Sequence, residues 1–256
     1  MSTPKPSGTF VTRRGLIVTG LGASLAACDR LHEDRTFRSI LGATEQLNYR
    51  AHRLLTDRGA LAREYRPEER SPVFRTNGTT MPASPAYQAH LAQGFANWRL
   101  RVDGLVARNL SLSLAQIRSM PQRSQITRHD CVEGWSAIGG WTGVPLRLLL
   151  DLAGLRDGAR FVVFHCADDY DGAPYYESVD LIDAFHPQTI LAWAMNGEPL
   201  PVGNGAPLRL RVERMLGYKH AKYVERIEVR STLAGLGRGK GGTWEDLAGY
   251  EWYAGI

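Results

Sequence analysis

The sequence predicts an α+β protein built around a mixed sheet. Many short segments alternate apolar and polar residues or form short apolar runs, as strands do. A few short segments with helical spacing lie between them, and the chain carries no internal repeat. With 256 residues, of which 43% are hydrophobic, the chain can bury a sizeable core and needs no disulfide framework.

Four segments are predicted as helices, one of which is the short run of residues 181–185. Leucines at roughly helical spacing indicate a helix within residues 30–65. Ser113 is suited to be the N-cap of a short helix that runs to residue 120. A leucine-rich helix is expected over residues 145–153, and Gly154 is placed to end it.

The remaining segments are predicted as strands and one long connection. Residues 66–90 contain four prolines, which indicates an extended segment that wraps around the surface. The predicted strands share an alternating or continuously apolar pattern, and they cover residues 98–106, 125–129, 160–166, 175–179, 190–196, 208–212 and 223–230.

Residues 1–27 are typical of a leader that directs export, which leaves residues 28–256 as one functional domain. Arg13 and Arg14 form a pair, and the uncharged stretch after them is shorter than the roughly 20 apolar residues that cross a bilayer. This pattern fits a twin-arginine leader and a periplasmic location. The run that ends at Cys28 resembles the lipobox of bacterial lipoproteins, so we expect a lipid on Cys28 that contacts the membrane. An ordinary cleavage site beside a chance cysteine is the alternative.

The charge of the chain argues against nucleic acid as a partner. The net charge is +5, but residues 1–27 hold Lys5, Arg13 and Arg14 and no acidic residue. Three of the five net positive charges therefore belong to the leader, and the rest of the chain is close to neutral. A domain that binds nucleic acid usually carries a strong basic patch.

Cys131 is the residue with the clearest chemical potential. It lies in a charged run, whereas a structural cysteine usually lies among apolar residues. Arg128 and His129 would favour its thiolate, while Asp130 and Glu133 would oppose it. A thiolate is either a nucleophile or a soft metal ligand.

The residues alone leave three possibilities open. Cys131 could bind a metal, or it could be the nucleophile of an exported hydrolase with His129 as its base, because both side chains would lie on one face of a strand. The protein could also be a non-catalytic lipoprotein. A disulfide between Cys131 and Cys166 is a further alternative. The sequence has no C-x-x-C and no paired histidines at the spacing of zinc ligands.

Several motifs in order resemble the molybdopterin-binding domain of the sulfite oxidase family. Within that family the chain is most similar to the single-domain periplasmic branch of methionine sulfoxide reductase catalytic subunits. The resemblance covers roughly residues 40–232. The motifs are His129-Asp130-Cys131-Val132-Glu133-Gly134-Trp135-Ser136, Trp141-Thr142-Gly143-Val144-Pro145-Leu146, Met195-Asn196-Gly197-Glu198-Pro199-Leu200-Pro201, Asn204-Gly205-Ala206-Pro207-Leu208-Arg209 and Gly217-Tyr218-Lys219-His220-Ala221-Lys222.

The resemblance implies a sulfite-oxidase-type fold and a molybdenum–molybdopterin cofactor. Cys131 matches the cysteine whose thiolate binds molybdenum in the family, and a soft sulfur ligand suits such a metal. Asn204 and Arg209 fall at the spacing of pterin contacts, and Arg209 could bind a phosphate. A further match is the segment that holds the cofactor phosphate through backbone amides and a cation, and it consists of His220, Ala221 and Lys222.

Three weaker matches complete the expected cofactor site. Cys166 stands where the methionine sulfoxide reductase branch has a threonine, and cysteine forms poorer hydrogen bonds. The family also contacts the pterin from an early helix. Asn48 and Arg50 are the counterparts chosen here, although the pattern around them departs from that of the family.

The expected activity is the transfer of an oxygen atom and two electrons. Reduction of an S- or N-oxide and oxidation of sulfite would use the same metal ligands, so the sequence does not give the direction. The substrate could be a small molecule or an oxidised group on a protein. Because the chain has no C-x-x-C-H haem-attachment motif, we expect electron transfer through a separate haem or cytochrome partner.

Overall fold

The computed structural model describes residues 34–256, so the predicted leader and Cys28 lie outside the described residues. The chain divides into two units, residues 1–55 and 56–256. The described part of the first unit is mainly α2 (Arg35–Leu55), which confirms a helix within residues 30–65. None of the described helices combines the length and the apolar character needed to cross a membrane.

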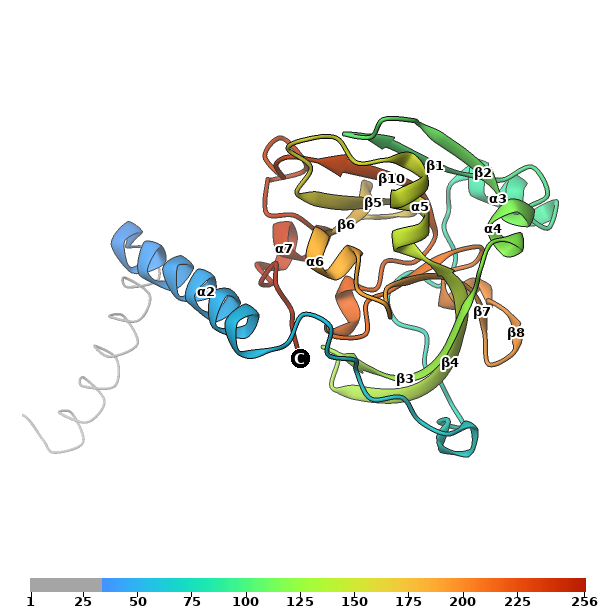
Figure 1. The fold of residues 1–256 in the computed structure, drawn as a ribbon, viewed down its shortest axis with the longest axis horizontal. Coiled ribbons are helices and arrows are strands. Elements are labelled where there is room, and N and C mark those ends of the chain that lie inside the picture. The colour runs from blue at the N-terminus through green and yellow to red at the C-terminus, as the bar shows by residue number, and fades with distance from the viewer. Residues whose placement is uncertain (1–33) are drawn as a thin grey trace, which may run out of the picture. The chain divides into compact units, whose positions relative to one another are not determined.

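The second unit contains two five-stranded sheets in its described residues (Figure 1). The strands are β1 (Arg99–Gly104), β2 (Leu110–Ser113), β3 (Arg123–Cys131), β4 (Trp135–Pro145), β5 (Phe161–Tyr170), β6 (Ala173–Asp180), β7 (Ile190–Met195), β8 (Glu198–Pro199), β9 (Arg209–Arg211) and β10 (Val224–Arg230). One sheet has the order β2-β1-β10-β5-β6, with β1 and β10 parallel and the other neighbours antiparallel. The other has the antiparallel order β3-β4-β7-β8, with β9 also paired to β7. The α+β prediction with a mixed sheet is confirmed.

Short helices and turns connect these strands. They are η1 (Pro67–Glu69), α3 (Pro85–Ala92), α4 (Leu114–Ser119), α5 (Leu146–Ala153), α6 (Leu181–Ala184), η2 (Val202–Asn204), η3 (Gly217–Lys219) and α7 (Thr243–Ala248). Ser113 caps α4 as predicted, because its hydroxyl accepts from the Gln116 amide at 3.2 Å and the Gln116 side chain returns to the Ser113 amide. Gly154 follows α5 with φ of +68°, which confirms the predicted end of that helix.

One predicted segment is partly wrong. Residues 66–90 were expected to be extended throughout, but Pro85 begins α3. Proline is tolerated in the first helical turn, and the Ser84 hydroxyl accepts from the Tyr87 amide as a cap. Before α3 the chain does follow the second sheet, where Ser71 exchanges hydrogen bonds with the backbone of Ile138.

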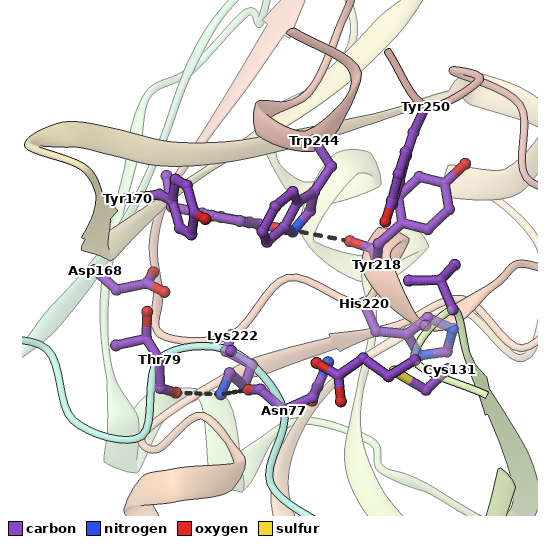
Figure 2. Close-up of a pocket in the computed structure, with 15 residues that line it drawn as sticks. Asn77, Thr79, Cys131, Asp168, Tyr170, Tyr218, His220, Lys222, Trp244 and Tyr250 are labelled. Carbon is purple, nitrogen blue, oxygen red and sulfur yellow. Dashed lines mark hydrogen bonds between the residues drawn. The ribbon is translucent and has the colours of Figure 1, made fainter. Parts of the chain in front are cut away.

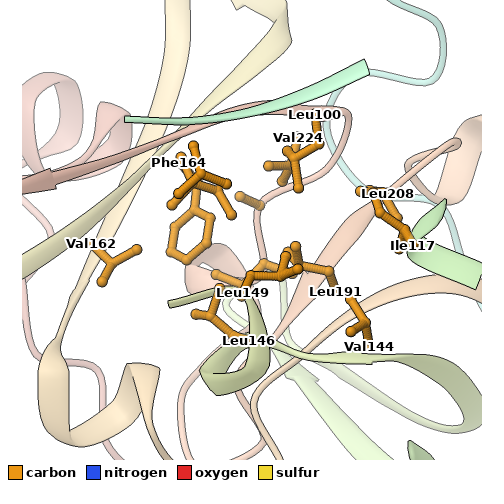
Figure 3. Close-up of a cluster of buried hydrophobic side chains, with 14 of the residues drawn as sticks. Leu100, Ile117, Val144, Leu146, Leu149, Val162, Phe164, Leu191, Leu208 and Val224 are labelled. Carbon is orange, nitrogen blue, oxygen red and sulfur yellow. The ribbon is translucent and has the colours of Figure 1, made fainter. Parts of the chain in front are cut away.

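The main hydrophobic core lies between the two sheets and is closed by α5. Figure 3 shows Val162 and Phe164 of β5 facing Leu146 and Leu149 of α5, with Leu191 of β7 beside them. All five side chains are fully buried. Burying large aliphatic and aromatic side chains stabilises the fold by roughly 1.5–3 kcal/mol each.

Cys131 is the last residue of β3, at the tip of the β3–β4 hairpin. Along β3 the side chains of Gln125, Thr127, His129 and Cys131 alternate inward, which confirms that His129 and Cys131 share a face. The turn after Cys131 is closed by a hydrogen bond from the Gly134 amide to the Cys131 carbonyl at 3.1 Å. Gly134 has φ of +83°, a conformation that favours glycine.

A close contact between strands fixes β4 against β7. A Cβ atom on Gly143 would lie 2.1 Å from the Leu191 carbonyl oxygen, which belongs to the backbone and has little room to move. On the same strand, a Cβ atom on Gly140 would meet its nearest neighbour at 3.4 Å.

We therefore predict that Gly143→Ala lowers the free energy of unfolding by about 1–3 kcal/mol, because the added methyl group overpacks the β4–β7 contact. Gly140→Ala is the control from the same strand and should change stability much less. Thermal unfolding of the two variants checks this, since each kcal/mol lowers Tm by about 2–4 °C in a domain of this size. Equal melting temperatures of the two variants would show that the β4–β7 contact at Gly143 does not require glycine.

Candidate active site

A cavity of about 370 Å³ opens beside Cys131, within the range of volumes typical of small-molecule sites. It has two unlike walls (Figure 2). Polar side chains, among them Asn77, Asp168 and Lys222, lie along one side with Cys131 at the end. Aromatic side chains lie along the other. The lining residues are Asn77, Gly78, Thr79, Cys131, Val132, Glu133, Asp168, Tyr170, Tyr175, Gly217, Tyr218, His220, Lys222, Trp244 and Tyr250.

The Cys131 side chain is buried at the edge of this cavity, with 8% of its surface exposed. Burial raises the pKa of its thiol above the ordinary value, and the Glu133 carboxylate adds to this effect. The Glu133 backbone amide and the Arg209 guanidinium oppose it. The protein alone therefore favours the neutral thiol, and a bound cation would be needed to favour the thiolate.

His129 is poorly placed to activate Cys131. Its Nδ1 lies 3.1 Å from Nη1 of Arg211, and its Nε2 packs against Gly217. Burial, followed by Arg209 and Arg211, holds the pKa of His129 well below its usual range, so the ring is neutral. A hydrolase would need an imidazole nitrogen directed at the thiol. The geometry therefore gives no support to the hydrolase alternative. Cys131 and Cys166 are both free thiols, so they do not form the alternative disulfide.

Arg209 and Asn204 are hydrogen-bonded to each other and have unused hydrogen-bonding groups, although neither is among the residues that line the cavity. Arg209 is 1% exposed and donates from Nη1 to the Asn204 carbonyl at 3.1 Å. Its Nε and Nη2 atoms, and Nδ2 of Asn204, are buried without a partner among the described residues. Burial, together with the neighbouring Arg211, lowers the pKa of Arg209 to about 9. A buried guanidinium with idle donors is unfavourable unless an anion or another acceptor binds to it.

Arg211, two residues away on the same strand, is fully satisfied by comparison. It donates from Nε and Nη2 to the Glu213 carboxylate at 2.9 and 2.6 Å, and both side chains are fully buried. Both arginines also lie over the Trp141 ring, at 5.4 Å for Arg209 and 4.2 Å for Arg211. The contrast marks Arg209 as the arginine whose charge is available to a ligand.

Lys222 lines the cavity, but its ammonium group already binds backbone carbonyls. Nζ donates to Asn77 at 2.6 Å, to Gly203 at 3.0 Å and to Thr79. Burial, with the nearby Arg209, lowers the pKa of Lys222 to about 7, while Asp168 opposes the shift. Lys222 therefore holds the segment around residues 77–79 against the cavity, and its predicted phosphate contact stays a prediction.

His220 lines the cavity, and Ala221 is buried behind it. The amides of these two residues donate to the carbonyls of Gly217 and Lys219, so both are engaged within the turn. The His220 ring differs from these amides. Its Nε2 lies 3.0 Å from the Met215 carbonyl, but its Nδ1 has no partner among the described residues. The ring nitrogen is thus better placed than the amides to meet a ligand.

Cys166, the weaker prediction in the second unit, is not among the residues that line the cavity. Cys166 belongs to the hydrophobic core on β5, and burial raises its pKa well above the ordinary value. Asn48 and Arg50 lie on α2 in the first unit, with exposed side chains. The assignment of these three residues to the cofactor stays a prediction.

Sequence reasoning missed several residues that line the cavity. Asn77 has a buried Oδ1 without a partner among the described residues, and Asp168 has a buried Oδ1 of the same kind. Burial raises the pKa of Asp168 to about 6. The Asn77-Gly78 pair signals only a turn, and nothing local in the sequence shows that this turn closes over Cys131.

The idle polar atoms fit the cofactor that the resemblance implies. Arg209 offers charged donors for a phosphate, and Asn204, Asn77 and His220 offer donors and acceptors that suit a pterin. Cys131 offers a soft ligand at the same cavity. No group of three or more His, Cys, Asp or Glu side chains in residues 34–256 could hold a metal ion by itself. A metal held by one cysteine and by the cofactor's own sulfur atoms agrees with that finding.

We predict that Arg209→Ala weakens molybdopterin retention by about one to two orders of magnitude, because one charge-assisted hydrogen bond contributes roughly 1.5–3 kcal/mol. Arg211→Ala is the matched contrast. It should instead lower the free energy of unfolding by about 3–5 kcal/mol, because Glu213 is left buried and unpaired. Pterin content after gel filtration and thermal unfolding separate the two effects. Full pterin content in Arg209→Ala would show that Arg209 does not hold the cofactor.

Comparison with known proteins identifies the family of the chain. A model of the oxidoreductase molybdopterin binding domain matches residues 87–234. A putative protein-methionine-sulfoxide reductase subunit, YedZ1, from Azospira oryzae is 35% identical over 98% of this chain and 88% of that protein. The protein-methionine-sulfoxide reductase catalytic subunit MsrP of Campylobacter jejuni is 34% identical over 65% of this chain, which spans only 59% of that protein.

A solved structure supports the fold. The sulfane dehydrogenase SoxCD from Paracoccus pantotrophus superposes with a TM-score of 0.51 at 21% identity, over 60% of this chain and 41% of that chain. The sulfite-oxidase-type fold expected from the sequence is therefore confirmed. The match to the family model, the relatives and the fold together establish that this chain belongs to the oxidoreductase molybdopterin-binding family and is a molybdopterin-dependent oxidoreductase.

Proposed function

We propose that this protein reduces methionine sulfoxide with electrons from a separate carrier. The observation that carries the proposal is the charge of the cavity. Glu133 and Asp168 line it, and the ammonium of Lys222 is taken up by backbone carbonyls. These carboxylates would repel an anion such as sulfite but not a neutral sulfoxide. The names of both relatives, methionine sulfoxide reductase subunits, agree with this choice.

The chain's residues have defined roles in this proposal. Cys131 binds the molybdenum, and the bound cofactor supplies the centre at which an oxygen atom and two electrons are transferred. Arg209 and Asn204 would hold the cofactor through donors that have no partner among the described residues. The β3–β4 hairpin keeps Cys131 at the cavity edge, and the surrounding side chains limit the access of water to it.

The reaction needs an electron donor that the described chain does not contain. Reduction of R₂S=O takes two electrons and two protons, breaks the S=O bond, and releases R₂S and water. We expect a haem or cytochrome protein to supply the electrons. The names of both relatives describe them as subunits, which agrees with a partner.

The location is part of the same proposal. Arg13-Arg14 and Cys28 support export through the twin-arginine route and a lipid that holds the protein at the periplasmic face of the membrane. Export of an already folded protein suits one that carries a large cofactor.

A direct substrate comparison tests the reaction. The purified molybdenum-loaded protein should oxidise a reduced viologen dye when methionine sulfoxide is added, and it should not reduce an electron acceptor with sulfite as the donor. Activity with sulfite and none with methionine sulfoxide would reverse the proposed direction.

The role of Cys131 has its own test. Cys131→Ser should fold with a melting temperature close to that of the wild type but lose turnover, because a hydroxyl is a poor replacement for a soft thiolate ligand. Cys166→Ser is the matched control, since Cys166 is also buried and free but lies in the core. Full turnover in Cys131→Ser would exclude it as the ligand.

Export is tested separately by two variants. Arg13→Lys combined with Arg14→Lys should leave precursor in the cytoplasm, because the paired arginines are what the twin-arginine route reads. Cys28→Ala should release the protein from the membrane fraction. Unchanged membrane association of Cys28→Ala would disprove the lipid on Cys28. The export route would still be tested by the arginine variant.

A further inference from the structure

Four aromatic rings form a continuous row along one side of the cavity. Tyr170 contacts Trp244 with 4.8 Å between ring centroids, Trp244 is stacked on Tyr250 at 6.0 Å, and Tyr250 contacts Tyr218 at 5.0 Å. Figure 2 shows this row opposite Asp168, Lys222 and Cys131. We call Tyr170, Trp244, Tyr250 and Tyr218 the aromatic wall.

Half of the aromatic wall comes from outside the residues that define the family. The family model ends at residue 234, whereas Trp244 lies on α7 and Tyr250 follows it. All cofactor contacts expected from the sequence lie before that point in the chain, and Figure 2 shows Cys131 and Lys222 across the cavity from Trp244. The segment of residues 243–250 is therefore placed to contact substrate without holding the cofactor.

Buried polar contacts fix this segment against the body of the second unit. Glu245, next to Trp244, accepts a hydrogen bond from Nζ of Lys219 at 2.6 Å, and Lys219 also pairs with Glu177. All three side chains are fully buried. Thr243 exchanges hydrogen bonds with the Tyr176 backbone at 2.9 and 3.1 Å. A six-residue helix has little stability by itself, so these contacts are what set its position.

Lys219 links both halves of the wall. It lies between Tyr218 and His220 in sequence, and both of these residues line the cavity. Its ammonium group reaches Glu245 on α7. One buried cation thus fixes Trp244 relative to Tyr218 and to the rest of the site.

We propose that residues 243–250 are the specificity-determining part of the cavity, in which Trp244 and Tyr250 bind the side chain of an oxidised methionine. Ring faces and edges suit a methyl group and a polarisable sulfur. Lys219 and Glu245 are positioning residues that hold these rings. This inference rests on the proposed reduction of methionine sulfoxide and adds the part of the chain that selects the substrate.

The experiment uses steady-state kinetics of the molybdenum-loaded enzyme with a peptide that contains methionine sulfoxide. Trp244→Ala and Tyr250→Ala should each raise KM by up to about ten-fold, the effect expected from losing one sulfur–aromatic contact. The kcat value and molybdenum content should stay close to those of the wild type. Trp244→Phe should restore most of the KM. With dimethyl sulfoxide, which lacks the methionine side chain, the change in KM should be smaller.

Two further variants separate positioning from general structure. Glu245→Gln leaves Lys219 paired with Glu177, so the protein should fold but show the raised KM of Trp244→Ala. Trp193→Ala removes a half-buried tryptophan that binds Gln122 outside the cavity, and it should leave KM unchanged.

The outcomes distinguish the two proposals. Normal wild-type turnover with unchanged KM in both Trp244→Ala and Tyr250→Ala would overturn the role of the wall alone. A loss of molybdenum in these variants would also overturn it, because the segment would then hold the cofactor. An enzyme that is inactive on every sulfoxide would overturn the proposed function itself.

Discussion

Two buried arginines, Arg209 and Arg211, lie on β9. Of these two, only Arg211 has a carboxylate partner among the described residues. Arg211 forms a bidentate pair with Glu213, whereas two donor atoms of Arg209 are buried without a partner among the described residues. Burying an uncompensated guanidinium is unfavourable, so the folded protein retains an unmet demand for an anion or other acceptors at this point. We propose that the phosphate of molybdopterin meets that demand.

The strands bring Cys131 to the same place from a distant part of the chain. Cys131 ends β3, and β9 reaches it through β7 and β4, which the close contact of Gly143 with Leu191 holds together. Cys131 and the two arginines are therefore fixed by sheet register. A site on regular elements is held more precisely than one on loops alone.

Local patterns in the sequence were sufficient for the framework and for part of the site. Alternation along β3 placed His129 and Cys131 on one face, and motif spacing grouped Asn204 with Arg209, which are bonded in the structure. Asn77 could not be found in this way, because its segment has no periodicity and is held over the cavity by Lys222. Helical spacing such as that around Asn48 is visible in a sequence, whereas the tertiary contact of a loop is not.

The aromatic wall was beyond prediction for a related reason. Tyr170 and Trp244 are far apart in sequence and meet only because Lys219, Glu177 and Glu245 form a buried cluster between β6, η3 and α7. Such a cluster contributes little to stability compared with an apolar replacement, since desolvation offsets the attraction between its charges. Its value here is geometric. The buried charge of Arg209 is left without a carboxylate partner, whereas the charge of Lys219 is paired with two carboxylates and fixes the rings of the aromatic wall.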